Sequence, residues 1–250
     1  MTNFCNLIIM TAIKAVFSLK NCSNGDLCRM IRTLLDSTDE LQAIASRSYV
    51  HVNQFVKITL QTNEDQIVRL HIWLPSITSI KQNPHTYGWG FCSRIISGIF
   101  VHTLYERTNP FERVVVNKNT DINDFLGLIN STTMSSKFHL HRLLLNKSNV
   151  IERHHTVFNQ TNEIVELHPV HVEIMKPGDE YELSRDACHT MIFMHQQSMG
   201  ITLIVADKKT DDYAFLYSNQ PNLPPNERKP CLTVSELTHY FRYVLSELEQ

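Results

Sequence analysis

From residue 48 onward the chain is a succession of short runs in which β-branched and aromatic residues alternate with polar ones. Examples are VHVNQFVKITL, QIVRLHIWL, KFHLHRLLL and GITLIVAD. Runs of this length and composition are typical of β-strands, and many strands with few helices between them favour antiparallel pairing over a parallel βαβ fold. We therefore expect a mainly-β fold, a sandwich or barrel of antiparallel strands over about residues 48–217.

Helical periodicity is confined to the two ends of the chain. In GDLCRMIRTLLD the apolar side chains share one helix face: Leu27, Met30, Ile31, Leu34 and Leu35. TDELQAIAS predicts a second short helix, so we expect an N-terminal helical region over about residues 1–47. Near the other end Thr233 and Glu236 have the spacing of a capping box ahead of an apolar stripe. This predicts a helix over about residues 233–249 that packs on the outside of the sheet.

Charge and hydropathy exclude two classes of partner. The chain has 23 basic and 25 acidic residues and no basic block, which argues against a nucleic-acid-binding protein. No run approaches the roughly 18 to 20 apolar residues of a membrane span. The apolar N-terminal stretch NLIIMTAIKAVF has no basic residue before it and is interrupted by Lys14, so a short helix is favoured over a targeting segment.

The numbers and spacing of cysteine, glycine and proline indicate the cellular compartment and the number of domains. Six cysteines are scattered without a C-x-x-C pair, which argues against a zinc ribbon or a thioredoxin-type site and predicts reduced thiols in a cytoplasmic protein. With only seven glycines and nine prolines, no low-complexity linker divides the sequence. We expect residues 1–250 to form a single domain.

The segment NPHTYGWGFCSRIISG carries the first candidate site. Residues two apart point to the same side of an extended strand, so His85 and Tyr87 project together and Phe91 can join them. The segment resembles the first signature of the cupins, small double-stranded β-helix barrels, which runs G, five residues, H-x-H, three or four residues, E, six residues, G. In that frame the five positions fall on Ser79, His85, Tyr87, Phe91 and Gly98.

A second segment resembles the second cupin signature, which runs G, five residues, P-x-G, two residues, H, three residues, N. In KPGDEYELSRDACHTMIFMHQ those positions fall on Gly178, Ser184, Asp186, His189 and Phe193. The resemblance covers about residues 48–207, with a longer than usual gap over about 99–177. It implies a cupin-like double-stranded β-helix barrel, flanked here by the N-terminal helices and the C-terminal helix.

The resemblance also implies a metal site. Cupins hold iron or manganese with imidazoles and often a carboxylate, and the thiol dioxygenases among them use three histidines. Transferred to this chain, His85 and His189 become ligands of a divalent transition metal, Fe(II) in the first instance, and His71 on a neighbouring strand completes the set, with His102 as a second candidate. For each of the latter two, the favoured explanation is a partly buried histidine bonded to a backbone carbonyl or a carboxylate.

Tyr87 replaces the second histidine of the signature. An unperturbed tyrosine pKa near 10 makes the phenol a poor ligand for Fe(II), so Tyr87 is expected to act as a catalytic residue that hydrogen-bonds a small-molecule substrate. Phe91 takes the glutamate position, and Met191 and Phe193 follow the alternation of His189 along one strand. These three side chains are expected to form an apolar wall that binds the substrate.

Two functional hypotheses follow from this resemblance. The first is a metal-dependent enzyme with dioxygenase-like oxidation of a small organic molecule. The second is a metal-free cupin that serves as a small-ligand-binding or protein-interaction module, because aromatic side chains at positions 87 and 91 occupy space that a metal and its waters need. Fold-level resemblance does not choose between them.

A rival metal pair is the true H-x-H of KFHLHRLLL, where His139 and His141 lie on one face of a strand. His154, His155, His168 and His171 follow it. No glycine or proline frame surrounds the pair, and Leu143 and Leu145 continue its face, which suits an apolar contact between strands of a homodimer equally well. Cys92 and Cys188 are each adjacent to a presumed pocket residue, so alternation points them to the opposite face.

Overall fold

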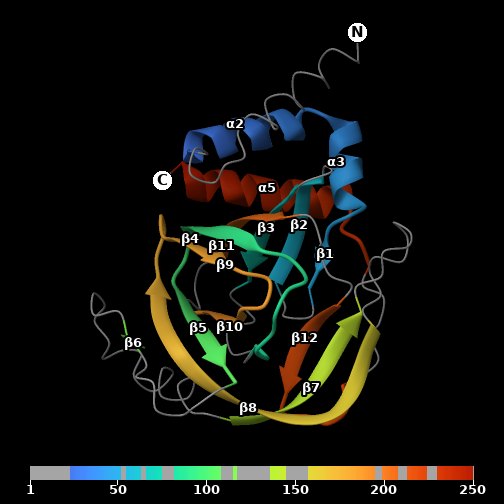
Figure 1. Ribbon diagram of the computed structural model, residues 1–250. Coiled ribbons are helices and arrows are strands. Elements are labelled where there is room, and N and C mark those ends of the chain that lie inside the picture. The colour runs from blue at the N-terminus through green and yellow to red at the C-terminus, as the bar shows by residue number, and fades with distance from the viewer. Residues whose placement is uncertain are drawn as a thin grey trace.

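The computed structural model describes residues 23–51, 55–62, 66–74, 82–107, 115–116, 136–144, 157–194, 199–207, 213–223 and 230–249. Two curled sheets and three helices make up this part of the chain, with the helices gathered on one sheet (Figure 1). The N-terminal run NLIIMTAIKAVF and the histidines at 154 and 155 lie outside the described residues.

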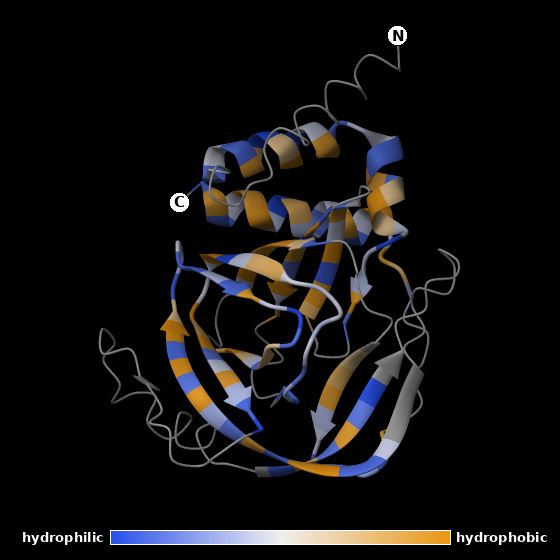
Figure 2. Cartoon of the chain, in the orientation of Figure 1, coloured by the Kyte–Doolittle hydropathy of each residue, from blue (hydrophilic) through white to orange (hydrophobic). Residues whose placement is uncertain are grey.

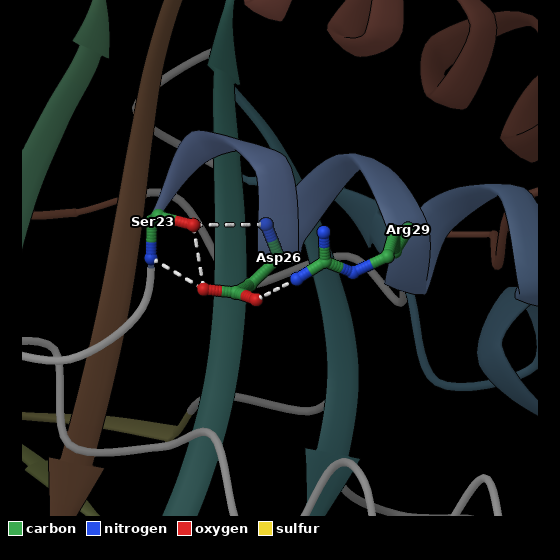
Figure 3. A network of polar contacts seen from close by, with 3 residues as sticks. All are labelled: Ser23, Asp26 and Arg29. Carbon is green, nitrogen blue, oxygen red and sulfur yellow. Dashed lines mark hydrogen bonds and ion pairs between the residues drawn. The ribbon is translucent and has the colours of Figure 1, made fainter.

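The three described helices are α2 (Asn24–Leu35), α3 (Thr38–Ala45) and α5 (Val234–Leu248). A capping box begins α2: the Ser23 hydroxyl accepts from the Asp26 amide at 3.2 Å, and the Ser23 amide donates to the Asp26 carboxylate at 2.9 Å. Arg29 extends this network by pairing with Asp26 (Figure 3). The capping box of Thr233 and Glu236 begins α5, as the sequence predicted.

The first sheet, sheet A, has six antiparallel strands in the order β1-β2-β3-β11-β4-β9. Their bounds are β1 (Tyr49–Val50), β2 (Phe55–Thr62), β3 (Gln66–Trp73), β11 (Gly200–Asp207), β4 (Phe91–Ser97) and β9 (Glu180–Leu183).

The second sheet, sheet B, runs β10-β5-β8-β7-β12, and the short β6 pairs parallel with β8. Its members are β10 (Cys188–Phe193), β5 (Phe100–Glu106), β8 (Val157–Met175), β7 (Ser136–Leu144), β12 (Tyr213–Ser218) and β6 (Val115–Val116). The 19-residue β8 pairs with both β5 and β7 and curves along the bottom of the view in Figure 1.

The outer face of sheet A packs against the helices. On β3 this face carries Val68, Leu70 and Ile72, which join Leu27 and Phe241 in one buried apolar cluster. The orange stripes of the helices and of the strands beneath them mark this helix-side core in Figure 2. Burial of such side chains is the main source of stability, at about 1.5 to 3 kcal/mol for each large one.

A second core lies between the two sheets and is built mainly of rings. Its buried members are Phe55, Trp73, Ile95, Phe100, Met175, Met191 and Phe193. Glycine is required where these rings approach the backbone, because a Cβ on Gly200 would stand 2.6 Å from the Phe100 ring and one on Gly98 would stand 2.7 Å from the Phe193 ring. Gly98 also has a φ of +91° and Gly178 one of +93°, so both glycines of the signature frames occupy left-handed turns.

The segment 84–87 connects the two outermost strands of the path through sheet B. The Thr86 amide donates to the Phe215 carbonyl and the Tyr217 amide donates to the Pro84 carbonyl, which ties the segment to β12. His85 and His189 exchange both backbone hydrogen bonds, which ties it to β10. The strands of sheet B and this segment therefore form a continuous ring.

The predicted mainly-β architecture, with helices before and after the strands, is confirmed. The curled antiparallel sheets agree with the cupin-like barrel that the sequence resembles. No helix in the described ranges is long and apolar enough to cross a membrane. The assignment of residues 1–250 to a single domain stays a prediction.

Candidate functional site

His85 and His189 lie next to each other, although 103 residues separate them in the sequence. Because their backbones exchange both hydrogen bonds, at 3.1 and 3.0 Å, the two side chains point to the same face. Their ring centroids are 4.9 Å apart. The two rings are neighbours on adjacent backbone segments.

His102 adds a third imidazole. It lies on β5, which pairs with β10 so that His102 is opposite Met191, one diagonal step from His189. The His102 Nε2 and His189 Nδ1 atoms are 3.1 Å apart, so one ring donates a hydrogen bond to the other. Both side chains are 2% exposed. We call His85, His102 and His189 the imidazole cluster.

Aromatic rings enclose the imidazole cluster. Tyr87 and Phe91 lie 5.5 and 6.0 Å from the His189 ring, and Tyr181 of β9 lies 4.6 Å from the His102 ring, all between centroids. Tyr181 occupies no defined position of the second signature frame. Its signal was the alternation of EYEL directly after Gly178, which points Tyr181 to the same side as Leu183.

Burial keeps the imidazole cluster neutral and the phenols protonated. Loss of water lowers the pKa of His85, lowers that of His102 to about 4, and lowers that of His189 well below its usual value, where the neighbouring imidazoles add to the effect. The same loss of water raises the pKa of Tyr87. Tyr87 is therefore a hydrogen-bond donor near neutral pH, not a phenolate.

Both ring nitrogens of His85 are already engaged. Its Nδ1 donates to the Asn83 carbonyl at 3.0 Å, which leaves Nε2 of the neutral ring to accept from the Tyr87 hydroxyl at 3.0 Å. His189 differs, since its Nε2 is buried with no hydrogen-bond partner. Within the cluster, the unpartnered His189 Nε2 is therefore an atom that a ligand can satisfy.

The described residues do not fit a resident transition metal. A catalytic metal needs about three protein ligands converging on one point. Here the His85 lone pair is used by Tyr87, the His102 Nε2 is used by His189, and the described ranges contain no group of three His, Cys, Asp or Glu residues able to hold an ion. The aromatic side chains at positions 87 and 91 supply no carboxylate in place of these donors.

His71 lies apart from the imidazole cluster. It is buried on β3, where its ring stacks on Phe55 at 4.3 Å between centroids. Its Nε2 has no hydrogen-bond partner, and loss of water together with the charges of Lys57 and Arg69 lowers its pKa well below the usual range. Its surroundings are thus basic and aromatic.

Met191 and Phe193 belong to the core between the sheets. Their side chains are 3% and 6% exposed and pack with Trp73, Phe100 and Met175. Phe91 lies closer to the imidazole cluster, in a small apolar group with Leu183, Ile204 and Ala206. Of the three side chains predicted to form a substrate wall, Phe91 is the one with a ring contact to His189.

Two further described histidines, His141 and His171, and two cysteines, Cys92 and Cys188, have ordinary structural surroundings. His141 is buried and its Nε2 donates to the Gln220 carbonyl at 3.2 Å, and His171 pairs with Glu173 at 3.4 Å. Cys92 packs in the helix-side core and Cys188 packs with Phe138 and Tyr217. Alternation along β4 and β10 thus points both thiols away from the imidazole cluster.

No protein-family model matches the chain, and no curated protein matches it. Similar solved structures include an uncharacterized protein with a double-stranded β-helix domain from Klebsiella pneumoniae, 11% identical over 69% of this chain and 92% of that chain, with a TM-score of 0.31. Another is hydroquinone 1,2-dioxygenase from Sphingomonas sp. TTNP3 with 4-hydroxybenzoate bound, 6% identical over 62% and 66%, with a TM-score of 0.30.

A third similar structure is CENP-C from Drosophila melanogaster bound to CAL1, 9% identical over 70% of this chain and 94% of that chain, with a TM-score of 0.30. These similar structures include a dioxygenase and a protein bound to CAL1. At these TM-scores they do not indicate what this chain does.

Proposed function

We propose that this chain is a cupin-like protein that binds a small organic molecule beside the imidazole cluster without a resident metal. The observation that carries the proposal is the engagement of both His85 nitrogens, by Asn83 and by Tyr87. A ring that donates with one nitrogen and accepts with the other has no lone pair left for a metal ion.

The same surroundings suit an organic ligand with a planar body. Aromatic faces of Tyr87, Phe91 and Tyr181 gather around His189 and His102. The unpartnered Nε2 of His189 offers one directional hydrogen bond among these rings. Ligand sites in proteins combine an apolar lining with a few polar atoms in this way.

Metal analysis of tag-free protein tests the proposal. We expect far less than one transition metal ion per chain after purification and an unchanged melting temperature after treatment with a chelator, because a metal bound to the native state stabilises it by mass action. Near-stoichiometric metal that is lost in a His85→Ala, His189→Ala double variant contradicts the proposal. His239→Ala is the matched control, since His239 is exposed on α5.

A second candidate is the metal-dependent, dioxygenase-like enzyme, with Fe(II) held by His85 and His189, and Tyr87 contacting the substrate. The gathering of three imidazoles, with ring centroids 4.9 and 5.2 Å apart, is the observation that favours it. It requires the Tyr87 hydroxyl to release His85. Iron-dependent oxygen consumption that disappears in the His85→Ala variant is the result that would select this candidate.

A further inference from the structure

The inner face of β3 presents polar groups that have no partner. Arg69, His71 and Trp73 alternate with the apolar residues of the outer face. The Arg69 Nε, His71 Nε2 and Trp73 Nε1 atoms are buried and make no hydrogen bond. Arginine and tryptophan side chains only donate hydrogen bonds, so the Arg69 Nε and Trp73 Nε1 atoms each need an acceptor.

A second cation lies beside Arg69. Lys57 of β2 is directly opposite His71 in the sheet, which makes it the diagonal neighbour of Arg69 on the same face, roughly 7 to 8 Å away between Cα atoms. The Lys57 ammonium donates to the Tyr49 hydroxyl at 3.1 Å and lies 5.2 Å from the centre of the Tyr49 ring. Within the described ranges its hydrogen-bond partner is thus a neutral group.

Neither cation is paired with a carboxylate in the described ranges. Ion pairs of arginine in those ranges include Arg29 with Asp26, Arg32 with Glu249, Arg107 with Glu163, and Arg185 with Asp186. Loss of water lowers the pKa of Arg69 and lowers that of Lys57 well below its usual value, and the charge of Arg69 lowers the latter further. Lys57 and Arg69 are both half-buried, so charging these neighbouring groups without a counter-ion is costly, and an anion between them removes that cost.

Aromatic rings lie beside these two basic side chains, and a series of ring contacts leads from Arg69 to the imidazole cluster. The Arg69 guanidinium lies 5.1 Å from the centre of the Trp89 ring, and Trp89 lies 5.7 Å from Tyr87, which contacts His189. On the other side Phe55 stacks on His71 and packs against Trp73. A ligand whose charge lies at Arg69 thus has aromatic faces on both sides for its body.

We infer that Arg69 and Lys57 bind the anionic group of a small aromatic acid, a carboxylate or a phosphate ester, whose ring packs among Trp89, Tyr87 and Trp73. The guanidinium of arginine matches both anions with two parallel hydrogen bonds. The inference rests on the proposed function and deepens it, because it names the chemical class of the ligand.

Fluorescence titration of the full chain tests the inference, because both tryptophans of the chain belong to the proposed site: Trp73 lies on the inner face of β3, and Trp89 lies against the Arg69 guanidinium. The probes are benzoate, phenyl phosphate and the neutral benzamide. We expect benzoate or phenyl phosphate to change the emission saturably and benzamide to bind at least about 10-fold more weakly, since a hydrogen bond to a charged group is worth about 1.5 to 3 kcal/mol.

Arg69→Met and Lys57→Met are expected to weaken the anionic probe about 10- to 100-fold each. Arg32→Met is the matched control, since it removes a positive charge from an exposed ion pair on α2, and it should leave binding unchanged. Circular dichroism spectra and melting curves of all three variants verify that they fold.

Equal binding of benzamide and benzoate, with no effect of Arg69→Met, overturns the inference and leaves the proposed ligand-binding function standing. Failure of every probe to bind at millimolar concentration also overturns it. Near-stoichiometric metal in the purified protein is a separate failure, because it overturns the metal-free function whatever the probes do.

Discussion

The two faces of strand β3 differ in the side chains that they bury: apolar on one face, polar or aromatic on the other. Val68, Leu70 and Ile72 point to the helices, where every one of them is buried in the helix-side core. Arg69, His71 and Trp73 point to the interior, and each carries a buried polar atom with no partner. The outer face therefore stabilises the fold. The unpartnered polar atoms of the inner face lower its stability, which is common at functional sites.

The largest expected effect lies on the helix side. Phe241 of α5 is fully buried in the helix-side core, so Phe241→Ala removes a large ring from a site that relaxes only in part. We expect a loss of about 3 to 5 kcal/mol in the free energy of unfolding, measured by urea denaturation. A loss below about 1 kcal/mol would mean that the helices contribute little to sheet A, and the comparison of the two faces would fail.

Low pH is expected to lower the free energy of unfolding through the buried histidines. His102 has its pKa lowered from 6.5 to about 4, so the unfolded chain takes up a proton at a higher pH than the folded chain does. Stability contributed by the neutral ring is present above pH 6.5 and is lost as the pH falls toward 4. The loss is on the order of 3 kcal/mol.

His85 and His189 act in the same direction as His102, because their pKa values are also lowered. Urea denaturation at a series of pH values measures the effect. A His102→Gln variant, which keeps a hydrogen-bonding side chain but does not titrate, should show a shallower dependence. A wild-type free energy of unfolding that stays constant across this window would contradict the neutral, buried state of the imidazole cluster.

The smallest expected change in stability is that of Arg69→Met on β3, and the substitution of its neighbour Leu70 is the comparison. Arg69→Met removes an unpaired cation from the interior, so we expect no loss of stability or a gain of roughly 1 kcal/mol. Leu70→Ala, one residue along and on the other face, should cost about 2 to 5 kcal/mol. Thermal and urea unfolding of both variants make the comparison, and a large loss in Arg69→Met would show that the guanidinium is structural.

Local patterns were sufficient to predict the architecture. Alternation and β-branched residues marked the strands, and the capping boxes and apolar stripes marked helices at both ends. These signals act over a few residues, so one sequence contains them. The spacing of the signature frames also indicated that His85 and His189 belong to one region, which the backbone pairing of the two residues satisfies.

The chemistry of the site depends on contacts that local patterns do not encode. That the Tyr87 hydroxyl and the Asn83 carbonyl engage His85 follows from the turn of an irregular segment. That His102 reaches His189 follows from the register of β5 with β10. Lys57 and Arg69 read as ordinary surface charges in the sequence, because nothing local tells which face of sheet A the helices cover.

The bridging segment 84–87 has a consequence for biosynthesis. Its partners lie far along the chain, as shown by the hydrogen bond from the Phe215 amide to the Thr86 hydroxyl, which spans 129 residues. The ring of sheet B therefore cannot close until β12 has left the ribosome. Until then the edges of β10 and of the nascent sheet stay open to other chains, so crowded, rapid expression is the condition under which this protein is most exposed to aggregation.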